Sequence, residues 1–255
     1  MGAGQVPNKV LGLIPIRYNS RRLHAKALLY IDNLPMIVHV YRRAKMSKLL
    51  SDVIVCCENK KIYDVLQKYN CKTIYTSKKH NNGTERIAEG YKKIKKKYDL
   101  IIDIQGDEPL INPRQIDQVI KFHLKNLDTD IIVPSLKTPV SEDENIVKIV
   151  KDINLNVLYI SRSKVPYGFK KKNKFLNKHL SIISFKPKAL IKFANSKKMF
   201  LEKIEGVELL RALEIGLKIK SPTFFGDSFA VEVKRDYIKA KNYIKTDKFY
   251  KFYKQ

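Results

Sequence analysis

Residues 99–111, DLIIDIQGDEPLI, decide the fold because they join an apolar run directly to a cluster of acids. The apolar residues 100–104 predict a buried strand. A glycine, two acids and a proline follow, so the strand ends at a turn that carries Asp107 and Glu108. Two interpretations are open: a solvated loop of ordinary turn residues, or a carboxylate at the carboxyl end of a strand, where open α/β sheets bind their ligands.

The same alternation of strand, polar loop and helix surrounds this stretch. Strands are expected at 9–16, 53–57, 72–76 and 100–104, and helices at about 36–48, 60–69, 84–97 and 113–127. We expect Thr84 to cap the third helix and Pro113 to lie in the first turn of the fourth. Four such repeats predict a parallel sheet with helices on both faces. Loops 17–26, 77–84 and 105–112 would then meet at one edge of the sheet.

The pattern changes after about residue 130. Strand candidates follow closely at 130–136, 145–152, 157–163 and 179–186, and helices return at about 187–197 and 207–215. Such clustering is typical of antiparallel additions to a parallel fold. We predict a single domain over 9–255, with an inserted β-rich subdomain at about 135–205 and a loose N-terminal segment over 1–8.

Composition indicates a folded protein of the cell interior. The chain has 255 residues, of which 44% are hydrophobic. No apolar run approaches the ~20 residues of a membrane span, and the first residues lack the apolar core of a signal peptide, so no stable membrane insertion is expected. The three cysteines have neither metal-site spacing nor an even disulfide framework. This pattern suits a reducing compartment and predicts a cytoplasmic location.

The net charge of +26 invites a nucleic-acid interpretation. Only 10 of the 51 cationic residues are arginines, however, and the lysines are scattered through every segment. The densest runs, at 92–98 and 170–175, are typical of solvated faces, and no known nucleic-acid-binding motif accompanies them. We therefore predict no nucleic-acid partner, although charge alone leaves that alternative open.

The first polar loop, RYNSRRLHAK at 17–26, follows a buried strand and concentrates cations. The chain has no GxxxxGK[ST] and no GxGxxG pattern, so the usual glycine cradles for phosphate are absent. Arginine offers a planar fork for phosphate or carboxylate that lysine cannot copy. We interpret Arg17, Ser20, Arg22 and Lys26 as a triphosphate cradle made of side chains, in preference to a loop of surface cations.

An ordered set of motifs resembles the 3-deoxy-manno-octulosonate (KDO) cytidylyltransferases, also called CMP-KDO synthetases. The set comprises IPIRYNSRRLHAK at 14–26, HNNGTERIAE at 80–89, IQGDEPLI at 104–111, NIVKIVKD at 145–152, LYISRSKVPY at 158–167, HLSI at 179–182 and LRALEIG at 210–216. The resemblance covers nearly the whole chain. It implies a three-layer α/β sandwich with a mostly parallel, nucleotide-diphospho-sugar transferase-like sheet, and a small β-rich subdomain through which a homodimer forms.

The resemblance also implies an activity: coupling CTP to KDO or a close acidic sugar, with CMP-sugar and pyrophosphate as products, for lipopolysaccharide or polysaccharide synthesis. The implied cofactor is Mg²⁺, with Asp107 and Glu232 as its ligands. The implied catalytic residues are Arg17, Arg22, Lys26 and Asp107. CTP would contact Arg17, Ser20, Arg22, Lys26, Ser77, Gly83, Thr84, Arg86 and Gln105, and the sugar would contact Arg162, His179 and Glu208.

The chain departs from the family pattern in the cradle, the metal site and the sugar site. His24-Ala25-Lys26-Ala27 replaces Pro-Gly-Lys-Pro in the first loop. Glu232 replaces an aspartate, Leu209 a glutamine and Ile183 an aromatic residue. These changes keep two alternatives open: the same chemistry on an amino-octulosonate or nonulosonate, and a nucleotide-binding paralogue with little activity. For Arg211, an ion pair with Glu208 at i, i+3 and a ligand contact are both open.

Overall fold

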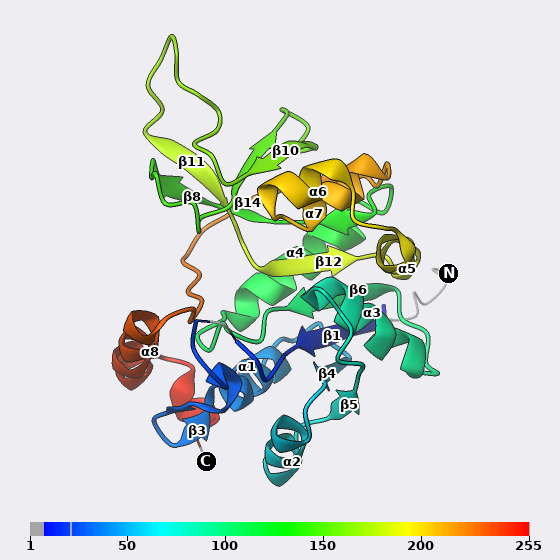
Figure 1. The fold of residues 1–255 in the computed structure, drawn as a ribbon, viewed down its shortest axis with the longest axis vertical. Helices are drawn as coiled ribbons and strands as arrows, with labels where there is room; N and C mark the ends of the chain where they lie inside the picture. Colours follow the sequence, from blue (N-terminus) through cyan, green and yellow to red (C-terminus); the bar gives the residue numbers. More distant parts are fainter. Residues whose placement is uncertain (1–7, 21, 255) are drawn as a thin grey trace, which may run out of the picture.

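The structure of the protein is a computed structural model that describes residues 8–20 and 22–254. Within these residues seven strands form the central sheet, in the order β13-β7-β12-β6-β1-β4-β5, and Figure 1 shows the part from β12 to β5. Neighbouring strands are parallel, except that β12 runs antiparallel to both β6 and β7. The strands are β1 Val10–Pro15, β4 Asp52–Cys57, β5 Thr73–Tyr75, β6 Leu100–Ile104, β7 Ile131–Ile132, β12 Ile182–Phe185 and β13 Ile219–Lys220. The predicted mostly parallel sheet is confirmed, whereas seven of the eight residues expected to form a loose N-terminal segment lie outside the described residues.

Helices cover both faces of this sheet. The first face carries α1 Met36–Lys45, α2 Lys60–Lys68 and α4 Pro113–Leu124, and α8 Lys234–Thr246 extends the same apolar cluster beside strand β2 Tyr30–Ile31. The second face carries α3 Gly83–Lys93, α5 Pro187–Asn195, α7 Leu209–Glu214 and the short α6 Phe200–Glu205. A hairpin of β2 with β3 Leu34–Pro35, and two 3₁₀ turns, η1 Lys26–Leu28 and η2 Tyr250–Phe252, complete this layer structure. No helix in the described part of the chain is long and apolar enough to cross a membrane.

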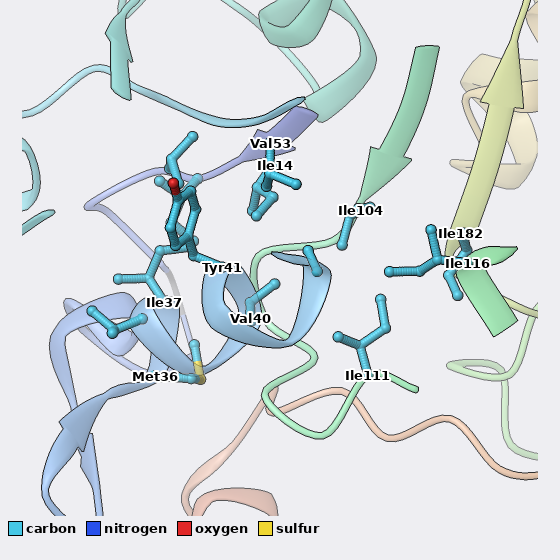
Figure 2. Packing of buried hydrophobic residues seen from close by; sticks show 14 of the residues in the cluster. Ile14, Met36, Ile37, Val40, Tyr41, Val53, Ile104, Ile111, Ile116 and Ile182 are labelled. Atoms are coloured by element: carbon cyan, nitrogen blue, oxygen red, sulfur yellow. The ribbon is translucent and has the colours of Figure 1, made fainter. Parts of the chain in front are cut away.

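Two apolar clusters explain why the central strands are hydrophobic along their whole length. In β1, Val10 and Ile14 pack into one cluster, while Leu11 and Leu13 pack into the other. Figure 2 shows part of the first cluster, where Ile14, Val40 and Ile104 come together from β1, α1 and β6. Because both faces are covered, every residue of β1 and β6 is buried. The apolar runs of the sequence are thus the signature of a three-layer sandwich.

Asparagines begin three of the helices that follow strands. The side chains of Asn59, Asn82 and Asn112 accept hydrogen bonds from the N–H groups of Lys61, Glu85 and Arg114 at 2.8, 2.8 and 3.0 Å. The expectation that Thr84 caps α3 is therefore wrong by two residues. The run NNGT contains three residue types that can cap a helix. Asn82 is the cap because α3 already begins at Gly83.

A second sheet carries the β-rich part of the chain, in the order β10-β9-β11-β8-β14. Its strands are β8 Ser135–Pro139, β9 Lys148–Lys151, β10 Val157–Ser161, β11 Phe175–His179 and β14 Thr223–Phe224. The single strand expected over 179–186 is in fact the end of β11 followed by β12, which crosses into the central sheet. An uninterrupted apolar pattern cannot show this change of sheet, because both sheets bury the same residue types.

The parallel strands bring their carboxyl ends to one edge of the central sheet. Ile16 N–H continues the pairing to Cys56 O at 3.0 Å, and Thr76 N–H bonds Cys57 O at 2.8 Å. The loops after β1, β5 and β6 therefore leave the sheet at the same edge, as the sequence predicts.

Gly90 on α3 allows this helix to approach β4 closely, which gives a test of the packing. A methyl group at position 90 would overlap the sulfur atom of Cys56. We expect Gly90→Ala to lower the free energy of unfolding by about 1 kcal/mol or more, despite the better helix propensity of alanine. Urea denaturation measures the change. In a Cys56→Ala background the same substitution should be neutral or stabilising, and an equal loss in both backgrounds would contradict the close approach.

Candidate active site

A cleft with a volume of about 450 Å³ opens at the carboxyl ends of β1 and β6. Three expected loops contribute to its wall, through Arg17 and Lys26, through residues 80–83, and through residues 105–107. The remaining lining residues are Pro15, Ile16, Arg86, Arg162, Gly206 and Glu208. The cleft therefore brings together eight of the residues predicted to form the site: Arg17, Lys26, Gly83, Arg86, Gln105, Asp107, Arg162 and Glu208.

Lys26 and Asp107 are in direct contact at the floor of this cleft. Lys26 Nζ lies 2.6 Å from Asp107 Oδ2 and 3.0 Å from the carbonyl oxygen of Val231. The two charged side chains are only 13% and 27% exposed, so the ion pair is partly shielded from water. Arg17 is exposed nearby and has no ion-pair partner among the described residues. The mouth of the cleft therefore presents positive charge to an anion.

A second cavity, of about 230 Å³, adjoins the first and shares Gln105, Asp107, Arg162, Gly206 and Glu208 with it. His179 and Glu232 line this second cavity. Between the two predicted metal ligands, the N–H group of Val231 donates to the carbonyl oxygen of Asp107 at 2.9 Å. This backbone contact keeps the Glu232 segment beside the loop that carries Asp107.

Asp107 and Glu232 form a donor set that fits Mg²⁺ only together with a ligand. The part of the chain that the structure describes holds no group of three or more His, Cys, Asp or Glu side chains arranged around a metal position. Mg²⁺ is commonly held by one or two carboxylates, with phosphate and water oxygens completing the octahedron. Each carboxylate is paired with a cation, Asp107 with Lys26 and Glu232 with Arg22 at 2.9 Å. Two carboxylates at a cationic cleft therefore suit a metal that arrives with phosphates.

Arg86 supports the wall of the cleft from within. Its side chain is buried, and Nη1 donates to Thr76 Oγ1 at 2.8 Å and to the carbonyl oxygen of Ser77 at 3.1 Å. An ion pair of 3.2 Å joins Arg86 to Glu58, whose other oxygen accepts from Tyr18 N–H at 2.8 Å. The arginine thereby connects the loop after β5 with the loop after β1.

Four predicted site residues do not line either cavity: Ser20, Arg22, Ser77 and Thr84. Thr84 is fully buried, and the Ser77 N–H group donates to Glu89 Oε2 at 2.9 Å. Arg22 reaches the second cavity only through its ion pair with Glu232. Ser20, Ser77 and Thr84 are therefore near the site in the chain without forming its wall, because the motif fixes their position in the chain but not the direction of their side chains.

The second cavity contains polar atoms without protein partners. Nε2 of His179 and Oε2 of Glu208 are buried and have no hydrogen-bond partner among the described residues. Burial raises the pKa of Glu208 to about 7 and lowers the pKa of His179 to about 4. Near neutral pH the histidine is therefore uncharged, and the glutamate is partly protonated. Such groups can donate to or accept from the hydroxyls of a polar ligand.

Arg162 lies between the two cavities with its guanidinium fixed by main-chain oxygens. It donates to the carbonyl groups of Glu205 at 3.0 Å, Glu144 at 2.8 Å and Gly206 at 3.4 Å. The carboxylate of Glu205 bonds the backbone N–H of Arg162 and not its guanidinium. The positive charge therefore remains available to a carboxylate in the cavity.

Arg211 has a different role from both predicted alternatives. It is 1% exposed and pairs with Glu202 at 2.6 Å and with Glu85 at 3.2 Å, not with Glu208. It lines neither cavity. The i, i+3 spacing to Glu208 does not form a pair, because Glu208 lies just before α7, where its side chain points into the second cavity.

Sequence reasoning placed the loop 77–84 at the site but did not name its residues His80, Asn81 and Asn82, and it missed Ser181 and Gly206 altogether. The ring of His80 is hydrogen-bonded to Glu89 at the other end of the same motif. A polar run before the cap of α3 was a usable signal for the first three. The departures Ile183 and Leu209 both line the second cavity, where they supply apolar wall.

The comparisons with known proteins agree with one another. The family model described as cytidylyltransferase matches residues 11–219. A 3-deoxy-manno-octulosonate cytidylyltransferase of Thermodesulfovibrio yellowstonii is 40% identical over 240 residues, which are 88% of this chain and 93% of that protein. An 8-amino-3,8-dideoxy-manno-octulosonate cytidylyltransferase of Shewanella pealeana is 37% identical over 213 residues, which are 82% of this chain and 87% of that protein.

A solved structure is similar over the whole fold. It is described as CMP:2-keto-3-deoxy-manno-octonic acid synthetase complexed with CTP. The match has a TM-score of 0.86 at 28% sequence identity and covers 93% of this chain and 98% of the other.

The raised pKa of Glu208 predicts a pH-dependent effect on stability. The folded protein holds the Glu208 proton more tightly than the unfolded chain, so this contribution is full below about pH 4.5 and is lost as the pH rises through about 7. Glu208→Gln cannot ionise. We expect its unfolding free energy, relative to the parent, to rise by roughly 1–3 kcal/mol between about pH 5 and pH 8, measured by urea denaturation. Parallel pH profiles for the two proteins would contradict the assignment.

Proposed function

Since the chain belongs to the KDO cytidylyltransferase family, we propose that this nucleotidyltransferase couples CTP to KDO, or to a close acidic sugar, and releases pyrophosphate. The observation that carries the proposal is the pair of adjoining cavities. One has a cationic mouth, the other has unpartnered polar groups, and Gln105, Asp107, Arg162 and Glu208 form their common wall. A reaction between a nucleotide and a sugar requires two such spaces that meet at the reacting atoms.

In the first cavity, Arg17 and Lys26 would hold the triphosphate, and Arg22 would join them from the Glu232 side. Charge neutralisation and positioning carry most of the catalysis in phosphoryl and nucleotidyl transfer. Arg17 supplies a fork that can bind two phosphate oxygens. Lys26 already contacts Asp107, so its ammonium group could bind a phosphate oxygen next to a metal held by Asp107.

We propose Mg²⁺ as the cofactor, held by Asp107 and Glu232 together with phosphate oxygens. When bound, it would neutralise phosphate charge and make the α-phosphorus more electrophilic. Glu232 is one methylene longer than aspartate and is supported by Arg22 at 2.9 Å. Because its side chain is longer than that of aspartate, Glu232 would reach the metal from a backbone position that lies further away.

The base and ribose would lie against the wall formed by residues 80–83, Arg86 and Gln105. Gly83 matters here because an added Cβ would lie 3.1 Å from the ring of Pro15. Its missing side chain lets the start of α3 pack closely against Pro15 at the end of β1. Gln105 offers an amide to the ring edge, and Ser77 and Thr84 would contribute after local adjustment of the loop.

The sugar would occupy the second cavity, with its carboxylate on Arg162 and its hydroxyls on His179 and Glu208. Leu209 and Ile183 leave part of this cavity apolar. That wall supports an alternative substrate, such as an amino-octulosonate or a nonulosonate, with the same reaction. The relative from Shewanella pealeana carries an amino-sugar name, which gives this alternative a concrete precedent.

Three further proposals follow from the family. A homodimer would form through the second sheet, whose loop 162–174 exposes Tyr167 and Phe169 at 77% and 85%. The protein would work in the cytoplasm, where CTP is made. Its CMP-sugar would serve synthesis of lipopolysaccharide or another surface polysaccharide.

A panel of acidic sugars with each of the four nucleoside triphosphates and Mg²⁺ tests the activity and the substrate together. We expect pyrophosphate release with CTP and one acidic sugar, and little with the other nucleotides. CTP binding in calorimetry without product from any sugar would indicate the inactive paralogue. Tight retention on RNA near physiological salt would favour the nucleic-acid alternative.

Asp107→Asn tests the metal ligand directly. The substitution keeps the size of the side chain but removes the charge that would hold Mg²⁺ and pair with Lys26. We expect the rate of pyrophosphate release to fall by about 10²-fold or more, with an unchanged circular dichroism spectrum. A rate close to that of the parent would remove Asp107 from the metal site.

A further inference from the structure

Arg43 is a buried cation that the proposed reaction does not use. It lies on α1, is 1% exposed and is among the largest fully buried side chains of the protein. Its Nε donates to the carbonyl oxygen of Ile111 at 2.6 Å, and Nη2 donates to that of Leu110 at 2.9 Å. These two carbonyl groups belong to the loop that begins after β6 and carries Asp107.

The other side of the same guanidinium binds the end of α8. Nη1 lies 2.6 Å from Asp247 Oδ1, and Nη2 lies 3.3 Å from Asp247 Oδ2. Asp247 Oδ1 also accepts from the N–H groups of Phe249 and Tyr250, at 3.0 and 2.9 Å. One arginine therefore satisfies two carbonyl groups and a carboxylate, which the three donors of a lysine on a flexible stem cannot match.

The opposite end of α8 leads to the second predicted metal ligand. Glu232 lies two residues before the helix, and Asp236 Oδ2 holds the N–H groups of Glu232 and Val233 at 3.1 Å each. A helix of 13 residues spans about 20 Å and is stiff over that length. Arg43 is thus connected to Asp107 through residues 110–111, and to Glu232 through Asp247 and α8.

We propose that Arg43 is a positioning residue, and that its contact with Asp247 forms a buried strut that fixes the Asp107 loop and the Glu232 segment relative to each other. At the cleft, the hydrogen bond from Val231 N–H to Asp107 O joins the two segments directly. Figure 2 shows the side chain of Ile111 within the apolar cluster that also contains Val40 of α1, so packing anchors the loop where Arg43 binds its backbone. The strut itself does not depend on the proposed function; only the identity of what Asp107 and Glu232 bind rests on it.

Hydrogen exchange of the free protein tests the strut without reference to activity. The variants are Arg43→Lys, which removes the fork, and Asp247→Asn, which keeps an oxygen for the Phe249 and Tyr250 N–H groups but removes the charge. Leu66→Ala on α2 is the control, because it cuts a cavity in the same apolar cluster away from the cleft. We expect the amides of Ile111 and Val231 to exchange about tenfold faster in both strut variants, and no faster than in the parent in the control.

The magnesium requirement separates positioning from plain stability. In both strut variants we expect the Mg²⁺ concentration for half-maximal pyrophosphate release to rise about threefold or more, a change of about 0.7 kcal/mol, while Leu66→Ala at a similar loss of thermal stability leaves it unchanged. Unchanged exchange at Ile111 and Val231 overturns the strut. Faster exchange with an unchanged magnesium requirement overturns its positioning role. If the parent releases no pyrophosphate, the proposed function fails, and calorimetry of magnesium–CTP binding by the same variants decides the positioning role instead.

Discussion

The contact between Lys26 and Asp107 is the constraint on which the site depends. It joins residues 81 positions apart in the chain, and the same ammonium group holds Val231 from near the C-terminal helix. This contact is possible only because parallel β1 and β6 end at the same edge of the sheet. In the proposed reaction the first of these segments would hold the triphosphate, and the other two would hold the metal. Their meeting point is therefore a property of the sheet topology, and not of any single loop.

The same edge concentrates carboxyl groups at a cost to stability. Asp103 is fully buried on β6, and burial raises its pKa well above the usual value. Burial likewise raises the pKa of Glu108 to about 7, the same as that of Glu208. Uncharged acids of this kind can donate as well as accept hydrogen bonds. Of these three acids only Glu208 lines the cavities, so its unpartnered carboxyl oxygen is the one available to a polar ligand.

The sequence predicts the central sheet well because burial on both faces leaves an unbroken apolar signal in each strand. It fails where that signal is weak or ambiguous. Helix α8 has only Ala240 and Ile244 fully buried, so its lysine-rich sequence resembles a solvated loop. The loop motifs indicate which residues gather at the cleft, but not which way they face, and Thr84 and Ser77 line neither cavity. The strut through Arg43 and Asp247 has no local pattern at all, because its partners are 204 positions apart.

The few arginines of this lysine-rich chain occupy positions with a common physical requirement. Arg17 and Arg162 line the cleft, and Arg22 pairs with a predicted metal ligand. Arg43 and Arg211 are instead buried: Arg43 binds one carboxylate and two main-chain carbonyl groups, and Arg211 binds two carboxylates. The common property is the need for a rigid fork with several donors, whether the acceptor is a ligand or the protein itself. In a chain whose cations are mostly lysines, an arginine therefore indicates a position that needs several donors in a fixed arrangement. Whether that arginine binds a ligand or stabilises the fold is decided by whether it lines a cavity.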